Sequence, residues 1–138
     1  MKTVLTRSPA ETKKLAAALA RKLKGGEIMA LSGPLGAGKT VFVKGLAQGL
    51  GIDQRKVKSP SFMLMFEHRQ GRLPLFHFDF YRITQAAEIE TLPWADCLKE
   101  KGVVMIEWPE RIQEYLPLET RRLSIEITGP KSRRITIG

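Results

Sequence analysis

Residues 33–40, with the sequence GPLGAGKT, constrain the fold of this chain more than any other segment. They match the pattern G-x-x-x-x-G-K-[ST] of a phosphate-binding loop, or P-loop, in which glycines let successive backbone N–H groups point at an anion. In such a loop Lys39 is expected to reach the β- and γ-phosphates, and the Thr40 hydroxyl is expected to ligate magnesium. The motif therefore predicts a site for ATP or GTP together with Mg²⁺.

The sequence on both sides of the loop predicts the strand and the helix that this mechanism requires. The apolar run 28–31 is typical of a buried strand, and apolar residues spaced along 40–50 predict an amphipathic helix. The N-terminus of that helix would direct its positive dipole end at the phosphates. An earlier helix is predicted after Ser8, because Ser8 and Glu11 form a capping box, and the glycine pair 25–26 would end it.

The rest of the chain alternates between strand and helix patterns. The segment 75–81 has phenylalanines on one face and His77, Asp79 and Tyr81 on the other. The remaining predictions are strands at 63–66 and 103–106, a helical stretch over 85–99 interrupted by Pro93, and a hairpin of 123–128 with 134–137. This order predicts the α/β class, with a P-loop NTPase-like three-layer fold and a mixed, mostly parallel sheet. No repeat or low-complexity linker divides residues 1–138, so a single domain is expected.

The chain is basic, with 23 Lys and Arg residues against 14 Asp and Glu and a formal net charge of +9. A surface of this sign attracts phosphate-bearing partners, and a nucleotide, an RNA and an acidic protein all stay open as such partners. No segment is apolar enough for a signal peptide or a membrane span. The lone Cys97 cannot form an internal disulfide and is expected to be a buried thiol in a reducing compartment. A cytoplasmic protein with no membrane partner is therefore expected.

Two acidic residues are candidates for holding the metal ion near the loop. Glu107 directly follows the apolar run VVMI, so it is expected at the carboxyl end of a strand, where α/β sheets bind ligands. Asp79 lies in HFDFYR, on the polar face of the alternating strand. An ion pair with Arg82 or Arg111 is the alternative for either acid, and His77 is either a base or a structural histidine. The pattern ranks Glu107 slightly ahead of Asp79.

The segment Ser59-Pro60-Ser61 lies between the predicted P-loop helix and the next strand. In nucleotide switches, loops at this position carry a hydroxyl that senses the γ-phosphate. A static turn set by Pro60 is the alternative on local evidence. The residues alone leave both interpretations open.

Several segments in a fixed order resemble one family. GPLGAGKT, KSPSF, HFDFYR, the pair Glu88-x-Glu90 and IEWPERI follow one another as in TsaE, a small bacterial ATPase needed for threonylcarbamoyladenosine (t6A) modification of tRNA. The resemblance covers most of the chain. It implies a mixed-sheet fold, bound ATP and Mg²⁺, weak ATP hydrolysis, and assembly with the proteins TsaD and TsaB. Hydrolysis would support threonylcarbamoyl transfer to adenosine 37 of tRNA, which TsaE does not itself perform, and direct contact with tRNA stays open.

The resemblance also implies roles for residues at matching positions. Catalytic roles fall to Lys39, Asp79 and Glu107. Thr40 and Glu107 would lie at the metal, with Asp79 at the nucleotide and the water shell of the metal, although which acid touches the metal directly stays open. The implied nucleotide contacts are Gly33, Leu35, Gly36, Ala37, Gly38, Lys39, Thr40, Asp79, Lys131 and Arg133.

The resemblance makes Ser59-Pro60-Ser61 the switch loop and gives Trp108 a role in supporting the site or a partner surface. Two positions depart from the family pattern. Pro34 stands where the family usually has an acidic residue, and Ser61 stands where it usually has threonine. Neither departure removes a group that the phosphate chemistry needs, because the Ser61 hydroxyl remains.

Two other functions stay open from the sequence. A small-molecule P-loop kinase shares the motif, although the segment 41–138 leaves little room for an Arg-bearing lid and an acceptor pocket. A basic RNA-binding module with a vestigial nucleotide site would also fit the charge. A phosphorylated product would favour the kinase, and RNA affinity that is independent of ATP would favour the module.

Overall fold

Seven strands form a single mixed sheet in the computed structural model, which describes residues 1–138. The strands are β1 Lys2–Thr6, β2 Ile28–Ser32, β3 Met65–His68, β4 Leu75–Asp79, β5 Val103–Glu107, β6 Arg121–Ile127 and β7 Arg133–Ile137. The α-helices are α1 Pro9–Ala20, α2 Lys39–Gly49 and α3 Trp94–Lys99, and the 3₁₀ helices are η1 Gln54–Lys56, η2 Ala86–Thr91 and η3 Pro109–Tyr115. None of the helices has both the length and the apolar character to span a membrane.

The strand order across the sheet is β1-β7-β6-β2-β5-β4-β3. The four central strands run parallel, in the pairs β6–β2, β2–β5 and β5–β4. The outer pairs β1–β7, β7–β6 and β4–β3 are antiparallel. The predicted mixed sheet is confirmed, but the prediction that it is mostly parallel is wrong. Half of its pairs are antiparallel, because short connections join β3 to β4 and β6 to β7 as hairpins.

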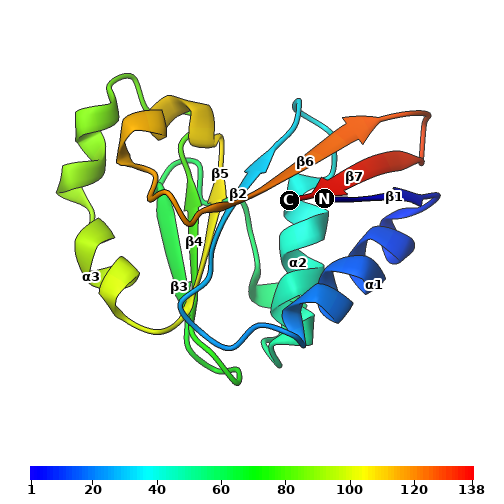
Figure 1. Ribbon diagram of the computed structural model, residues 1–138, viewed down its shortest axis with the longest axis horizontal. Helices are drawn as coiled ribbons and strands as arrows, with labels where there is room; N and C mark the ends of the chain where they lie inside the picture. Colours follow the sequence, from blue (N-terminus) through cyan, green and yellow to red (C-terminus); the bar gives the residue numbers. More distant parts are fainter.

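Helices cover both faces of the sheet, which confirms the three predicted layers. Figure 1 shows α1 and α2 on one side of the sheet and α3 on the other. A cluster of 20 buried residues lies between the sheet and the α1–α2 pair, and a cluster of 11 lies beneath α3, η2 and η3. The β4 strand contributes to both clusters, Leu75 to the first and Phe76 and Phe78 to the second. Because side chains alternate, His77 and Asp79 lie on the same buried face as Leu75.

The helix α1 begins as the sequence predicts. Ser8 Oγ accepts a hydrogen bond of 3.1 Å from the Glu11 N–H, and the Glu11 carboxylate accepts one of 2.9 Å from the N–H of Arg7, one residue before the cap. Pro9 occupies the first turn, where its missing N–H costs nothing. The helix ends at Ala20, earlier than the glycine pair predicted to stop it.

The helices α1 and α2 approach each other closely because α2 carries two glycines on the shared face. A Cβ atom at Gly45 would clash with the Lys13 backbone, 2.6 Å from its Cα, and one at Gly49 would lie 2.6 Å from the Cβ of Ala20. Larger side chains at these two positions would push the helices apart. The glycines therefore set how α2, and with it the P-loop, sits against the rest of the fold.

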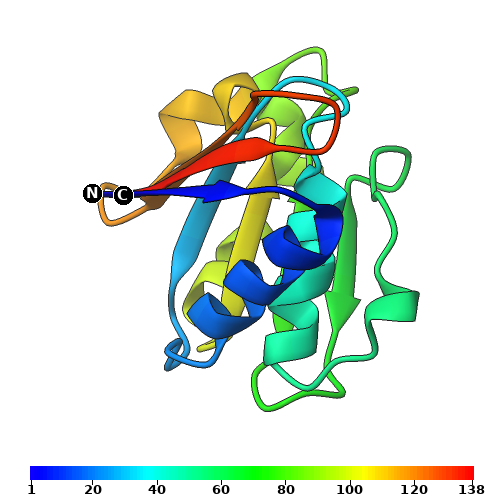
Figure 2. The same ribbon diagram turned by 90° about the vertical axis from the view of Figure 1, so that its right-hand side faces the viewer.

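Several elements differ from the sequence prediction. The sequence gives no clear signal for β1, because only Thr6 of this strand is buried; pairing with β7 forms it, and Figure 2 shows the two strands side by side. β3 begins at Met65, later than predicted, because Leu64 adopts a left-handed backbone with φ of 65° and its N–H bonds to the Pro60 carbonyl. The stretch 85–99 is η2 followed by α3, and Pro93 separates them as predicted.

Candidate functional site

The loop 33–38 joins the end of β2 to the start of α2 in the centre of the sheet. Gly36 and Gly38 have φ angles of 79° and 97°, a region that favours glycine. Gly33 has no space for a side chain, since a Cβ atom would lie 2.8 Å from the Ile125 carbonyl oxygen. Gly38 caps α2 without a side-chain hydrogen bond, so the first N–H groups of the helix stay available to an anion.

Lys39 is buried at the base of this loop. Its Nζ donates a 2.6 Å hydrogen bond to the Gly33 carbonyl and lies 3.5 Å from the ring centroid of Trp108. Burial lowers the pKa of the Lys39 amine, while the carboxylates of Glu107 and Asp79 oppose that shift. The ammonium is therefore held by the loop and an aromatic ring, and the charges of two acids act on it.

Asp79 lies at the end of β4 and holds the predicted switch loop. One carboxylate oxygen, Oδ2, accepts hydrogen bonds from Ser61 Oγ at 2.9 Å and Ser59 Oγ at 3.2 Å. The other, Oδ1, accepts from the N–H of Tyr81 at 2.9 Å. All of these bonds are internal to the protein. Ser59 and Ser61, predicted to sense the nucleotide, are thus hydrogen-bonded to Asp79, one of the two acids predicted to act at the metal.

Glu107 lies beside Asp79 at the end of the neighbouring strand β5, and the two residues are partners in the strand register. Its Oε2 is 2.5 Å from Nε2 of His77, which is fully buried. Neither Asp79 nor Glu107 forms an ion pair with Arg82 or Arg111, the alternative considered from the sequence. His77 has no access to solvent, so its geometry does not fit a base that acts on a bound water.

A cavity of about 280 Å³ brings most of these groups together. Trp108 closes one side of it with a left-handed backbone, φ of 59°, and its ring lies 4.9 Å from that of Tyr81. No cluster of three or more His, Cys, Asp or Glu side chains exists that could hold a metal ion. The predicted residues that line the cavity are Leu35, Gly36, Gly38, Lys39, Thr40, Ser59, Ser61, Asp79, Glu107 and Trp108.

Lys131 and Arg133 do not line that cavity. They line an adjoining hollow of about 170 Å³ together with Gly36, Ala37 and Gly38. The Arg133 guanidinium donates to the Ala37 carbonyl at 2.8 Å and to the Gly36 carbonyl at 3.1 Å, so it braces the outside of the loop. Gly33 lines neither space, and its carbonyl accepts the hydrogen bond from Lys39.

Sequence reasoning missed four residues that line the smaller hollow, Pro9, Thr12, Val41 and Pro130. Pro9 and Thr12 belong to α1, where capping and helical spacing explain them fully. No local signal places α1 beside the P-loop, because that contact arises only when β1 and β7 pair and bring the start of α1 to this edge.

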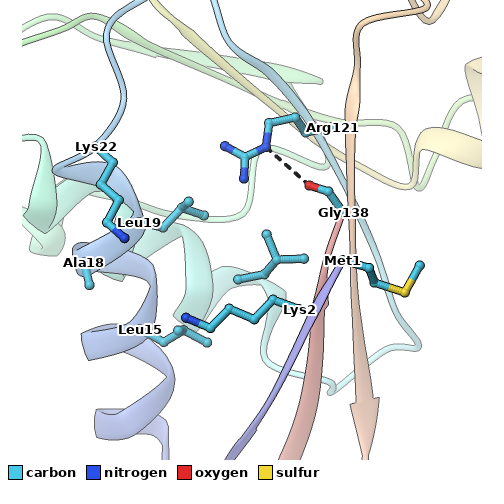
Figure 3. Close-up of a pocket in the computed structure, with 9 residues that line it drawn as sticks. Met1, Lys2, Leu15, Ala18, Leu19, Lys22, Arg121 and Gly138 are labelled. Atoms are coloured by element: carbon cyan, nitrogen blue, oxygen red, sulfur yellow. Dashed lines mark hydrogen bonds between the residues drawn. The ribbon is translucent and has the colours of Figure 1, made fainter.

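A larger hollow, of about 370 Å³, lies away from the P-loop (Figure 3). It is bounded by β1, α1 and the ends of β6 and β7, with Lys2, Lys22 and Arg121 around Leu15 and Leu19. None of the residues predicted to act on a nucleotide is among those that line it. Size therefore does not identify the functional site in this fold, whereas the convergence of charged groups does.

A P-loop between a central parallel strand and a helix, with carboxylates at the ends of two neighbouring strands, defines an α/β protein of the P-loop class. Residues 6–135 match the family model described as "Threonylcarbamoyl adenosine biosynthesis protein TsaE". The chain belongs to the TsaE family, whose members are named for the biosynthesis of t6A in tRNA.

Individual relatives agree with this assignment. The chain is 43% identical to the TsaE protein of Bacillus subtilis over 95% of its own length and 81% of the relative. It is 38% identical to the TsaE protein of Treponema pallidum, covering 96% of the chain and 97% of the relative. The crystal structure of YdiB from Bacillus subtilis superposes with a TM-score of 0.82 and 37% identity, over 99% of this chain and 83% of that one.

Proposed function

We infer that this protein is a cytoplasmic, weakly active ATPase that supports threonylcarbamoyl transfer to adenosine 37 of tRNA together with TsaD and TsaB, without performing the transfer itself. The observation that carries this proposal is the 280 Å³ cavity, in which the P-loop lysine, the Thr40 hydroxyl, two strand-end acids and two switch-loop serines converge. Membership of a family named for t6A biosynthesis supports the pathway.

The loop and α2 would bind the phosphates through backbone N–H groups, and Lys39 would exchange its bond to the Gly33 carbonyl for one to a phosphate oxygen. The donors around the cavity are hard oxygen ligands, the Thr40 hydroxyl and the carboxylates of Asp79 and Glu107, and these fit Mg²⁺. When bound, Mg²⁺ supplies positive charge that stabilises the transferring phosphoryl group.

The two acids have different freedom to act on a metal. Both oxygens of Asp79 accept hydrogen bonds from the protein, whereas Glu107 makes a single one, through Oε2. Oε1 of Glu107 therefore remains for a ligand in the cavity. We assign direct metal contact to Glu107 with Thr40, and assign to Asp79 the coupling between the metal's water shell and Ser59 and Ser61.

The adjoining 170 Å³ hollow shares Gly36, Gly38 and Val41 with the phosphate cavity. If the nucleoside extends from the α-phosphate into this hollow, it would contact α1 and the turn before β7, where Lys131 could bind it. No group there is specific for adenine over guanine. Preference for ATP is therefore part of the proposal to be tested by competition between ATP and GTP.

The test is ATP hydrolysis by the purified protein, first alone and then with TsaB, TsaD and tRNA. We expect slow release of free phosphate that changes in the full mixture, together with ATP-dependent multiple turnover of tRNA modification. Transfer of phosphate to a small molecule, instead of release of free phosphate, would contradict the proposal and support the small-molecule kinase. RNA affinity that is equal with and without ATP, and unaffected by Lys39→Ala, would instead support an RNA-binding module with a vestigial nucleotide site.

A further inference from the structure

A polar pair lies inside the apolar layer between the sheet and α2. His77 on β4 is fully buried, and Glu107 at the end of β5 is 3% exposed. The distance between His77 Nε2 and Glu107 Oε2 is 2.5 Å. The other ring nitrogen, Nδ1, is buried and has no hydrogen-bond partner, so Glu107 is the only polar group that His77 contacts through its ring nitrogens.

If the residue at position 77 had a purely structural role, an apolar side chain would be expected there. On the same face, Leu75 precedes it on β4 and Met105 lies opposite it on β5, and both are fully buried. Burying a ring with an unpaired nitrogen costs free energy that a leucine at this position would not cost. A buried histidine that makes a single short bond to an acid of the site therefore points to a role through that acid.

We propose that His77 is a positioning residue for Glu107: the Nε2–H donates to Oε2, fixes the plane of the carboxylate, and leaves Oε1 directed at the cavity for the metal ion. This inference rests on the proposed function, because it takes Glu107 as a metal-site acid. Buried partners that orient metal ligands in this way typically affect metal affinity or activity by roughly 10–100-fold. The histidine itself touches neither nucleotide nor metal, since it does not line the cavity.

The sharpest test is the Mg²⁺ dependence of ADP binding, measured by calorimetry at fixed ADP over a range of Mg²⁺ concentrations. Replacing His77 by asparagine places an amide near Nδ1, too short to reach Glu107, whereas glutamine can place its amide near Nε2. We expect His77→Asn to raise the Mg²⁺ concentration at half-saturation by about tenfold. His77→Gln should stay within about threefold of the unaltered protein, and ADP affinity without Mg²⁺ should not change in either variant.

His68 is a matched control, because it is a second buried histidine on the neighbouring strand β3 and its Nε2 has no partner. His68→Gln should leave the Mg²⁺ midpoint unchanged. In a Glu107→Gln background, adding His77→Asn should have no further effect on that midpoint. An unchanged midpoint in folded His77→Asn, or equal effects of asparagine and glutamine, would overturn the positioning role while leaving the proposed ATPase intact. ADP binding by the unaltered protein that does not respond to Mg²⁺ would overturn both.

Discussion

Lys39 is ordered by contacts within the protein. The Gly33 carbonyl and the Trp108 ring fix its ammonium, and the Asp79 and Glu107 carboxylates favour its charged form despite burial. A side chain that is already ordered loses little conformational entropy when it binds a phosphate. The residue is thus organised in advance for the charge that the P-loop is built to bind.

Replacement of this single side chain should have a large effect on nucleotide binding. Lys39→Ala removes a charge-assisted hydrogen bond of about 2–3 kcal/mol, which weakens ATP binding by roughly 30- to 150-fold. Calorimetric titration with ATP and Mg²⁺ measures this loss. Lys44→Ala, on the same helix but outside both cavities, is the control and should bind as the unaltered protein does. Equal affinities of the two variants would remove Lys39 from the site.

At the scale of elements, the switch loop is tied to β4 by Ser59 and Ser61, which both donate to Asp79. If Asp79 turns toward the water shell of a metal, these bonds change and the loop moves. Trypsin can report this movement, because the exposed Lys58 directly precedes Ser59. We expect cleavage after Lys58 to differ in rate between ATP–Mg²⁺ and ADP–Mg²⁺. Cleavage after the exposed Lys24 is the control and should not differ, because Lys24 precedes β2, at the end away from the P-loop. Identical cleavage rates after Lys58 in the two nucleotides would show that the segment is a static turn.

The contact between α1 and α2 gives a prediction in which helix propensity and packing oppose each other. Gly49→Ala raises the intrinsic helix propensity of α2 by about 1 kcal/mol. The new methyl group would meet Ala17 and Ala20 on α1, and overpacking of this kind costs about 1–3 kcal/mol. We expect packing to win, so that urea unfolding shows a net loss of stability of about 1 kcal/mol. Gln48→Ala, on the exposed side of the same helix, should show no such loss.

The outcome of the sequence predictions follows from how local each signal is. The P-loop, the Ser8 cap and the break at Pro93 depend on residues a few positions apart, and the structure contains all three. The brace from Arg133 to the loop depends on a partner 96 residues away, and β1 depends on a strand still farther along the chain, so no local pattern reveals them.

The acids of the site show the same limit. The strand-end position of Glu107 is readable, because the apolar run VVMI stops there, whereas Asp79 is expected inside the strand 75–81 and instead ends β4. The side of the sheet that they face depends on the register of β4 against β5, as does the contact between His77 and Glu107. The alternating pattern predicts a strand over 75–81 with one polar face. In the structure both faces of β4 are buried, because helices cover the sheet on both sides.

At the scale of the whole molecule, the site joins parts of the chain that are distant in sequence. Its groups come from the ends of β2, β4 and β5, from α2, and through Arg133 from β7, so both core clusters contribute to holding it. A ligand at this site binds only the folded chain and stabilises it by RT ln(1 + [L]/Kd), about 2.7 kcal/mol at one hundred times Kd. We therefore expect ATP–Mg²⁺ at that concentration to raise the midpoint of thermal unfolding by roughly 8–12 °C in a single transition. Calorimetry checks this, with Lys39→Ala as the control that should show a shift of only about 1–3 °C at the same ATP–Mg²⁺ concentration. A shift in only one of two resolved transitions would mean that the two clusters unfold separately and that the site belongs to one of them.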